Sequence, residues 1–469
     1  MKGAGGRDRD SMIIALMVLV IVMDGLDASI VQVALPEMSR DLGMSVSDGA
    51  FIVIAYLVPL AGLCMPLARV AEAGRVRLML RLGVLVFLAT SVVCAAAPDR
   101  NVLVLARFVQ GFGAAVMVST APIMAVRMLG RERRHLGMAY LNAAGCIAIV
   151  IGPSVGGIVT GLLSWHWIFL VNVPICILML LMSSCMPRDG PVGRMRMPEP
   201  ARAAAMFVAV GTGLVALDCW TNGINGSLIA PLAVVAVASI VAFILLGRKA
   251  PVGDRLILPP LRGNRTYYIL TLVYFLSDIV GCGVFFILPH YLAGPAGYST
   301  LMAGLLLSLA TIMSAAVSIP AGRWCRSMGC RLPASISLAM RVVFCLMLAV
   351  IDPAMGAVFL IVQLVLMGLS FGVSGSSQST RMVERVDSRD RGSAASAVLF
   401  VNYIGNALGV ALFALIFRLS QPDGLATDIS LADPSMILTG VHGACLFGAM
   451  LSVVCLIISM AIPDPNHGE

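Results

Sequence analysis

The chain has 469 residues, of which 59% are hydrophobic and only 12% are charged, and its mean hydropathy is +0.97. Soluble domains carry about 25% charged residues, so this composition excludes a soluble core. The formal net charge of +8 raises the question of nucleic-acid binding, but the basic residues stand in short connections between long apolar segments, which is the distribution of a membrane protein.

Fourteen apolar segments are long enough to cross a bilayer as α-helices. They lie at 12–36, 50–68, 78–97, 101–126, 137–162, 166–186, 203–220, 228–247, 266–293, 301–321, 333–351, 355–378, 393–417 and 437–462. Two linkers that contain Pro and Arg, 187–202 and 248–265, bracket the seventh and eighth segments. We therefore expect an N-terminal six-helix bundle over 1–186, an inserted helix pair over 187–265 and a C-terminal six-helix bundle over 266–469. Two parallel six-helix repeats are typical of alternating-access transporters.

The connections between these segments alternate in basic content. With both termini in the cytoplasm, 27 of the 32 Lys and Arg residues fall on the cytoplasmic side. Arg40, Arg100 and Arg418 fall outside, and Arg107 and Arg341 lie within predicted helices. The positive-inside rule thus supports an even number of helices with both termini in the cytoplasm.

Two carboxylates, Asp24 and Asp27, interrupt the first segment. At ~1.5 Å of rise per residue, Asp24 lies about 18 Å from Met12, well inside a hydrocarbon core ~30 Å thick. An aspartate at the centre of a membrane helix costs roughly 2.5 kcal/mol or more, and residues three apart share a helix face. We therefore expect both side chains to face a polar cavity or a partner instead of lipid. The alternative for each acid is a local structural role beside Gly25.

Arg107 lies about six residues into the fourth segment, roughly 9 Å deep, which brings it near the level of the two acids. A guanidinium favours the charged form of a neighbouring carboxylate while burial disfavours it, so separating such a pair would load or release a proton. A static ion pair is the alternative. Asp278 lies 12 residues past Thr266 in the ninth segment, at the depth of Asp24 in the first, and is a further candidate for the same central cavity.

Small residues mark the fifth predicted helix. Gly145, Gly152, Gly156 and Gly157, together with Pro153, allow the close approach of a neighbouring helix and a bend. The alternative to a functional role for these glycines is ordinary tight packing of the helices.

Four stretches in order resemble the major facilitator superfamily, and within it the fourteen-helix drug:proton antiporter group. LDASIVQVALP at 26–36 is similar to the first-helix signature, with its aspartate at Asp27 and its polar position at Gln32. LARFVQGFGAA at 105–115 is similar to the fourth-helix motif, with Arg107, Gln110 and Gly111. GCIAIVIGPSVGG at 145–157 resembles the antiporter motif, and SWHWIFLVNVP at 164–174 resembles the sixth-helix entrance. The resemblance implies that the antiporter motif shapes the outward-closed state and suppresses leak.

The connection after the second helix, PLARVAEAGRVR at 66–77, resembles the family's gating loop in part. Glu72 stands nearest the expected aspartate, and Gly74, Arg75 and Arg77 fit the pattern. The first glycine is missing, and Ala73 stands where a basic residue is usual. The candidate gating loop is therefore degenerate.

The sequence contains no HExxH, GxSxG or Walker A motif, which disfavours an enzyme and an ATP-driven pump. The twelve cysteines include no CxxC pair, so neither a metal site nor a cofactor is expected. The resemblance implies a secondary active efflux transporter that exchanges protons for lipophilic, cationic compounds by alternating access, working as a monomer in the lipid bilayer. Proton-coupled export of one endogenous metabolite is the alternative, and a non-transporting receptor or scaffold is a more remote one.

Overall fold

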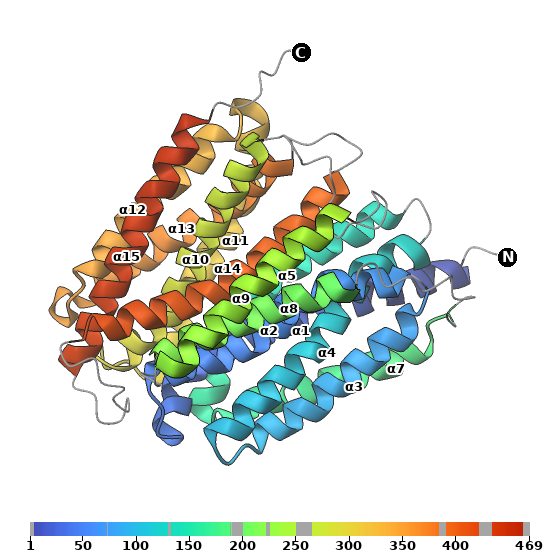
Figure 1. The fold of residues 1–469 in the computed structure, drawn as a ribbon, viewed down its shortest axis with the longest axis horizontal. Helices are drawn as coiled ribbons and strands as arrows, with labels where there is room; N and C mark the ends of the chain where they lie inside the picture. Colours follow the sequence, from blue (N-terminus) through green and yellow to red (C-terminus); the bar gives the residue numbers. More distant parts are fainter. Residues whose placement is uncertain are drawn as a thin grey trace. The chain divides into compact units, whose positions relative to one another are not determined.

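The structure is a computed structural model that describes residues 4–72, 74–129, 133–187, 189, 200–221, 226–249, 265–383, 391–421 and 434–462. Throughout these ranges the regular structure is helical, without a strand (Figure 1). The helices are α1 (Ala4–Asp41), α2 (Val46–Glu72), α3 (Val76–Ala95), α4 (Arg100–Met128), α5 (Arg134–Leu162), α6 (His166–Leu170), α7 (Asn172–Ser184), α8 (Pro200–Thr221), α9 (Gly226–Lys249), α10 (Arg265–Ala293), α11 (Thr300–Met328), α12 (Arg331–Ala349), the 3₁₀ helix η4 (Pro353–Met355), α13 (Gly356–Val383), α14 (Arg391–Leu419) and α15 (Pro434–Ala461).

Among the described residues, 12 segments are long and apolar enough to cross a membrane. Six of them correspond to the predicted spans before the inserted pair and six to those after it, so the all-α membrane fold is confirmed. α8 and α9, of 22 and 24 residues, form at the positions of the inserted pair. At ~1.5 Å per residue each is about 33 Å or longer, enough for the hydrocarbon core. The count of fourteen spans stays a prediction.

Polar side chains at the ends of the apolar segments determine where several helices begin. Asp99 Oδ1 accepts hydrogen bonds from the backbone N–H groups of Asn101 and Val102, at 2.8 and 3.0 Å, at the start of α4. Before α2, the Ser45 amide donates to Asp48 Oδ2 at 3.0 Å and the Asp48 amide donates to Ser45 Oγ at 3.2 Å. Such reciprocal bonds satisfy the amides that a helix N-terminus leaves unpaired.

The chain divides into two compact units. The first comprises Met1–Ala34, Phe51–Gly213 and Pro231–Leu256, and the second comprises Leu35–Ala50, Leu214–Ala230 and Ile257–Glu469. In the first unit α3 packs against α4 and α7, and in the second α10 packs against α14 and α15 while α13 packs against α11 and α12. The three-part division expected from the sequence stays a prediction.

Glycines permit the closest of these helix contacts. A Cβ atom on Gly83 of α3 would lie 2.9 Å from the carbonyl oxygen of Gly113 of α4, and a Cβ atom on Gly113 would lie 2.9 Å from the Gly83 carbonyl oxygen. The two backbones can therefore touch only because neither position carries a side chain.

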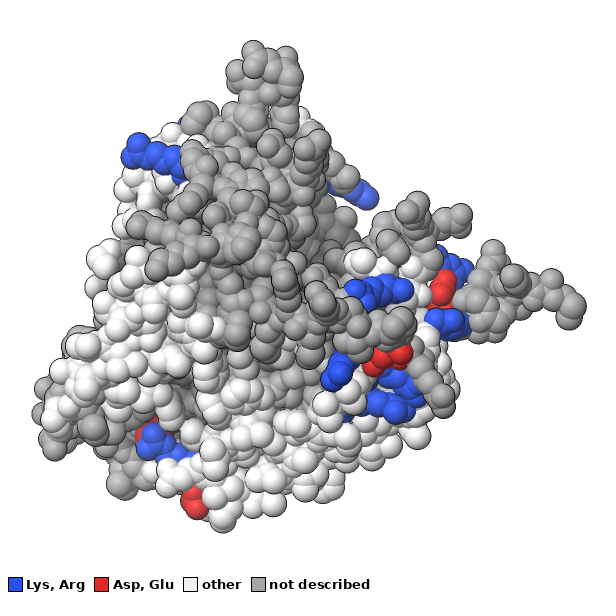
Figure 2. Space-filling model, turned by 45° about the vertical axis from the view of Figure 1, so that its right-hand side comes forward, with Lys and Arg blue, Asp and Glu red and all other residues white. Residues whose placement is uncertain are grey.

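Large apolar side chains cover much of the exposed surface. On α15, Leu446, Met450 and Ile457 are 58%, 61% and 63% exposed. Figure 2 shows that the charged side chains of the described residues stand in small groups, and that wide areas of the visible surface carry none. A surface of this kind fits contact with lipid acyl chains.

Candidate functional site

Asp27 lies at the centre of a buried polar cluster in the first unit. Arg107 Nη1 contacts Asp27 Oδ2 at 2.6 Å, and each of the two side chains is 1% exposed. Asn172 Nδ2 donates to the other carboxylate oxygen, Asp27 Oδ1, at 2.8 Å. Helices α1, α4 and α7 thus each supply one group, and both oxygens of the carboxylate have a donor.

The hydrogen bonds continue from Arg107 toward α3. Arg107 Nη1 also donates to Gln110 Oε1 at 2.7 Å, and Gln110 Nε2 donates to Ser91 Oγ at 2.8 Å. Arg107 and Gln110 are three residues apart, so they share one face of α4. The structure therefore brings together two residues that the fourth-helix motif singled out, and adds Ser91, which the sequence did not indicate.

Tyr56 of α2 joins the second acid of α1 to the same cluster. Its hydroxyl donates to Asp24 Oδ1 at 2.6 Å, and the centre of its ring lies 4.2 Å from the guanidinium carbon of Arg107. Asp24 is 8% exposed and Asp27 is 2% exposed. Neither acid faces lipid, as the cost of a charge in the hydrocarbon core requires.

Asp278 lies in the second unit, on α10. Asn402 Nδ2 of α14 donates to Asp278 Oδ2 at 3.1 Å, and Asn406 Nδ2 donates to Asn402 Oδ1 at 3.3 Å. A Cβ atom on Gly405 would lie 2.9 Å from Asp278 Cβ, so glycine at this position lets α14 approach the acid closely. Asp278 therefore rests against a neutral amide, whereas Asp27 rests against a cation.

A known protein family matches most of this chain. Residues 17–410 match the family model described as Major Facilitator Superfamily. The chain belongs to the Major Facilitator Superfamily. The superfamily resemblance seen in the sequence is thereby confirmed, and the narrower assignment to the fourteen-helix antiporter group stays a prediction.

Relatives of this superfamily member include named resistance proteins. Puromycin resistance protein pur8 of Streptomyces alboniger is 30% identical over 410 residues, which cover 84% of this chain and 78% of that protein. The putative multidrug resistance protein MdtD of Escherichia fergusonii is 27% identical over 288 residues, which cover 61% of this chain and 60% of that protein. The relatives and the superfamily are membrane transporters, so the protein is a multi-pass transporter of small molecules and not an enzyme.

Solved structures of transporters share the fold. A bacterial homolog of the human lysosomal transporter Spinster aligns with a TM-score of 0.68 and 15% identity, over 97% of this chain and 96% of that chain. The nucleoside transporter NupG aligns with a TM-score of 0.63 and 14% identity, over 96% of this chain and 98% of that chain. At such low identity the likeness concerns the fold alone.

The glycines of the candidate antiporter motif place α5 of this Major Facilitator Superfamily protein directly against α1. A Cβ atom on Gly156 would lie 3.2 Å from the Ile30 Cα, and one on Gly152 would overlap the side chain of Ser29. Gly145 leaves more room, since the nearest atom, in Ile21, is 3.7 Å away. Pro153 lies inside α5, and Gly157 is buried. The close approach falls within one turn of Asp27.

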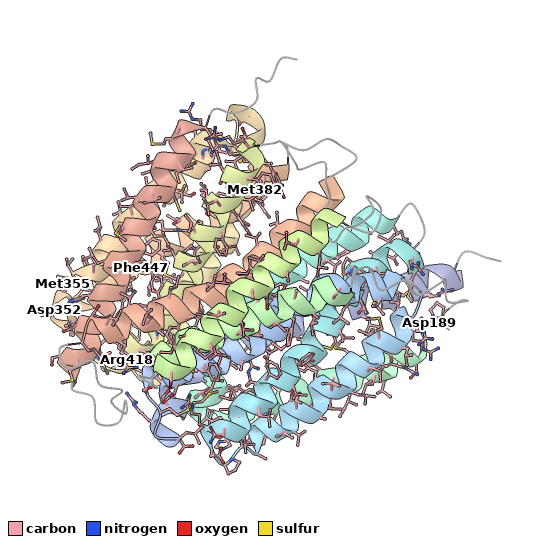
Figure 3. The ribbon with its side chains drawn as sticks, viewed as in Figure 1. Asp189, Asp352, Met355, Met382, Arg418 and Phe447 are labelled. Carbon is pink, nitrogen blue, oxygen red and sulfur yellow. The ribbon has the colours of Figure 1, made fainter. Side chains whose placement is uncertain are left out.

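The candidate gating loop of the transporter is fastened to the end of α7. Gly74 has a φ of +115°, which favours glycine, and Arg75 is exposed. Arg77 Nη2 donates to the Ser184 carbonyl oxygen at 2.8 Å. Asp189, labelled in Figure 3, accepts hydrogen bonds from the backbone N–H groups of Arg77 and Leu78 at 2.9 and 3.1 Å, and so caps α3. Glu72 is the last residue of α2, but its side chain and the whole of Ala73 lie outside the described residues.

Other candidate positions of the transporter stand apart from these contacts. Gln32 is 8% exposed on α1, and its Oε1 has no hydrogen-bond partner in the part that the structure describes.

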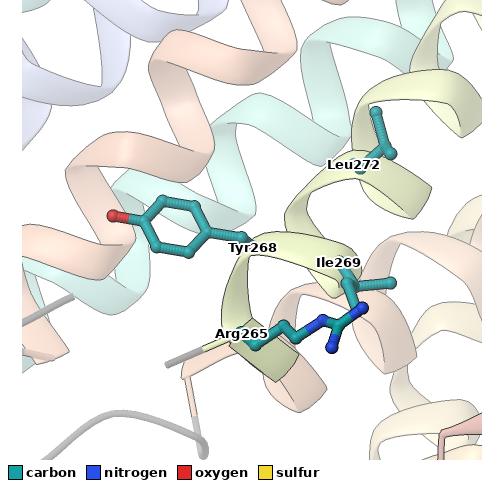
Figure 4. A pocket seen from close by; sticks show the side chains of 4 residues that line it. All are labelled: Arg265, Tyr268, Ile269 and Leu272. Atoms are coloured by element: carbon teal, nitrogen blue, oxygen red, sulfur yellow. The ribbon is translucent and has the colours of Figure 1, made fainter. Parts of the chain in front are cut away.

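A pocket of about 430 Å³ at the start of α10 is lined by Arg265, Tyr268, Ile269 and Leu272, and Figure 4 shows the Arg265 and Tyr268 side chains pointing to different sides of the helix. This pocket contains none of the three candidate acids.

Proposed function

We propose that the protein is a secondary active exporter that exchanges protons for lipophilic, cationic compounds by alternating access. It would work as a monomer in the inner membrane of a bacterium, with both termini in the cytoplasm. The observation that carries the proposal is the buried contact of 2.6 Å between Arg107 Nη1 and Asp27 Oδ2. The names of the relatives, a puromycin resistance protein and putative multidrug resistance proteins, support export of drugs.

The ion pair supplies a way to couple a proton to a conformational change. Arg107 stays charged, because a guanidinium keeps its proton in proteins. Breaking a buried ion pair leaves an uncompensated charge and costs about 3–5 kcal/mol. A proton on Asp27 removes one of the two charges, so the carboxyl group and Arg107 can separate at a smaller cost. Protonated and paired forms of Asp27 would therefore belong to different conformations of the protein.

Two further acids are suited to receive a cationic substrate. Asp278 accepts from the neutral amide of Asn402, and Asp24 accepts from the hydroxyl of Tyr56. A cation that approaches Asp278 does not have to displace an arginine, because no arginine is hydrogen-bonded to this carboxylate in the described part of the chain. Asp27 is less suited to this role, because a cation would compete there with Arg107.

Transport by purified protein in proteoliposomes tests the proposal. An imposed pH gradient should drive a cationic dye such as ethidium against its concentration gradient, and a protonophore should stop this movement. Asp27→Asn should abolish gradient-driven transport, because an asparagine side chain cannot take up and release a proton, while exchange of labelled dye without a gradient continues.

Asp10→Asn is the matched control, because Asp10 lies on the same helix and forms only a partly exposed pair with Arg133, at 3.7 Å. This variant should transport the dye at the rate of the natural protein. If Asp27→Asn and Asp10→Asn show the same rate of gradient-driven transport, Asp27 is not the residue that carries the proton.

A further inference from the structure

A second buried guanidinium, that of Arg341, lies in the second unit without a carboxylate within ion-pair distance among the described residues. Arg341 lies in the middle of α12 and is 3% exposed. Both of its hydrogen bonds come from Nη1, which donates to the Ser277 carbonyl oxygen at 2.6 Å and to the Ser277 hydroxyl. Nε is buried and has no partner within the described ranges. The edge of the guanidinium formed by Nε and Nη2 therefore makes no hydrogen bond there.

Asp278 attracts Arg341 electrostatically, but no carboxylate lies within ion-pair distance of this guanidinium among the described residues. The guanidinium carbon lies 4.9 Å from the centre of the Phe371 ring, and the face of an aromatic ring attracts a cation only weakly compared with an opposite charge. A charged side chain inside a membrane protein costs more than this unless an opposite charge accompanies it. Arg107 has that opposite charge in Asp27, at 2.6 Å, whereas Arg341 faces a hydroxyl, a carbonyl group and an aromatic ring.

A second unfilled hydrogen-bonding group lies beside the first. Gln378 Nε2 of α13 donates to Ser277 Oγ at 3.2 Å and to Ser374 Oγ at 2.6 Å. Gln378 is 5% exposed, and its Oε1 is buried without a partner in the described chain. Arg341 and Gln378 thus meet at Ser277, where the first offers unused donors and the second an unused acceptor.

The chemistry of the unused edge identifies the ligand group. Nε and Nη2 of an arginine present two parallel N–H donors that match the two oxygens of a carboxylate. Asp278 directly follows Ser277 in α10 and accepts a hydrogen bond only from a neutral amide among the bonds described. The Arg341 guanidinium of α12 therefore contacts the residue of α10 that directly precedes the Asp278 carboxylate.

We infer that Arg341, held in place by Ser277, binds the carboxylate of amphoteric lipophilic substrates, while Asp278 and the unused acceptor oxygen of Gln378 face their cationic group. The inference rests on the proposed export function and narrows its substrates to include compounds that carry both charges. It gives Arg341 a role that a pump for simple cations would not require.

A matched pair of fluorescent dyes tests this role. Rhodamine B carries a delocalised cation and a free carboxylate, and rhodamine B ethyl ester keeps the cation and lacks the carboxylate. The natural protein in proteoliposomes should export both dyes when a pH gradient is imposed. Arg341→Gln should lower the ratio of rhodamine B export to ester export by roughly 10-fold or more, because hydrogen bonds to a charged group are lost. Arg341→Lys keeps the charge without the two parallel donors and should lower the ratio less.

Arg331→Gln is the control, because Arg331 is the exposed first residue of the same helix, α12. This variant should leave the ratio unchanged. An unchanged ratio in Arg341→Gln, or an equal fall of both dyes, would show that Arg341 acts only in packing. If Arg341→Gln does not fold, the ratio in Arg341→Lys decides between the same two results. A natural protein that exports the ester and not rhodamine B overturns this inference and leaves the proposed function standing, whereas export of neither dye contradicts both.

Discussion

Asn172 Nδ2 donates to Asp27 Oδ1 at 2.8 Å, although 145 positions separate the two residues in the sequence. The amide comes from the first residue of α7, directly after the break between α6 and α7. The segment predicted over 166–186 corresponds to one span, His166–Ser184, in which only Val171, itself in a helical conformation, separates α6 from α7. Of the groups that hold Asp27, this amide is the neutral one, so it can accompany the carboxyl group whether or not Arg107 does.

Replacing Asn172 by Leu should destabilise the protein and slow gradient-driven transport. The substitution leaves Asp27 Oδ1 buried without its donor, which costs about 1–3 kcal/mol. Melting temperature in detergent and transport in proteoliposomes measure the two effects. Asn101→Leu is the control, because Asn101 is exposed at the start of α4. Equal melting temperatures of the two variants would contradict the role of the amide.

A double-mutant cycle should reveal strong coupling between Asp27 and Arg107. Asp27→Asn and Arg107→Gln each leave one buried charge without its partner, which costs about 3–5 kcal/mol, whereas the double variant removes both charges. The double variant should therefore be more stable than the Arg107→Gln variant in thermal unfolding.

The same cycle on Asp10 and Arg133 provides the comparison. This pair is 3.7 Å apart with side chains 22% and 30% exposed, and such pairs contribute about 0–1 kcal/mol. Additive losses at Asp27 and Arg107, as at the exposed pair, would show that the buried contact contributes little to stability.

Gly152→Ala should disturb the packing of α1 against α5. The added methyl group would overlap the side chain of Ser29, so one helix must shift, and overpacking of this kind costs about 1–3 kcal/mol. Gly322→Ala is the matched control, because an added Cβ atom there meets nothing within 4 Å. The amount of folded protein and the melting temperature should fall for Gly152→Ala only, and similar values for both variants would argue against a close contact at Gly152.

Asp189→Ala should destabilise the start of α3. The Asp189 carboxylate accepts from the amides of Arg77 and Leu78, and loss of such a cap costs about 0.5–2 kcal/mol. Asp352, also labelled in Figure 3, accepts from the Ala354 amide at 2.7 Å but caps only the exposed 3₁₀ helix η4. Hydrogen exchange should therefore rise in the first turn of α3 in Asp189→Ala and stay unchanged there in Asp352→Ala. Protection of that turn in both variants would contradict the capping role.

Much of this fold follows from hydropathy, because each membrane span must be a long apolar helix that satisfies its own backbone. The twelve spans found in the described chain coincide with predicted segments for this reason. Depth along a helix can also be counted from the sequence, and this count placed Arg107 near the level of Asp24 and Asp27. The neighbouring helix that a side chain faces does not follow from this count. A single Tyr56, Ser91 or Asn172 in an apolar helix looks like an isolated polar residue until the neighbouring helices are positioned.

The attachment of Asp189 to the start of α3 has a practical consequence for dissecting the protein. Residues 77 and 78 depend for their hydrogen bonds on a carboxylate more than 110 positions later. A fragment that stops at residue 187 would lack this carboxylate, and one that extends past residue 189 would retain it. Split versions of the chain, and reporters inserted between its two halves, should therefore be joined on the C-terminal side of Asp189.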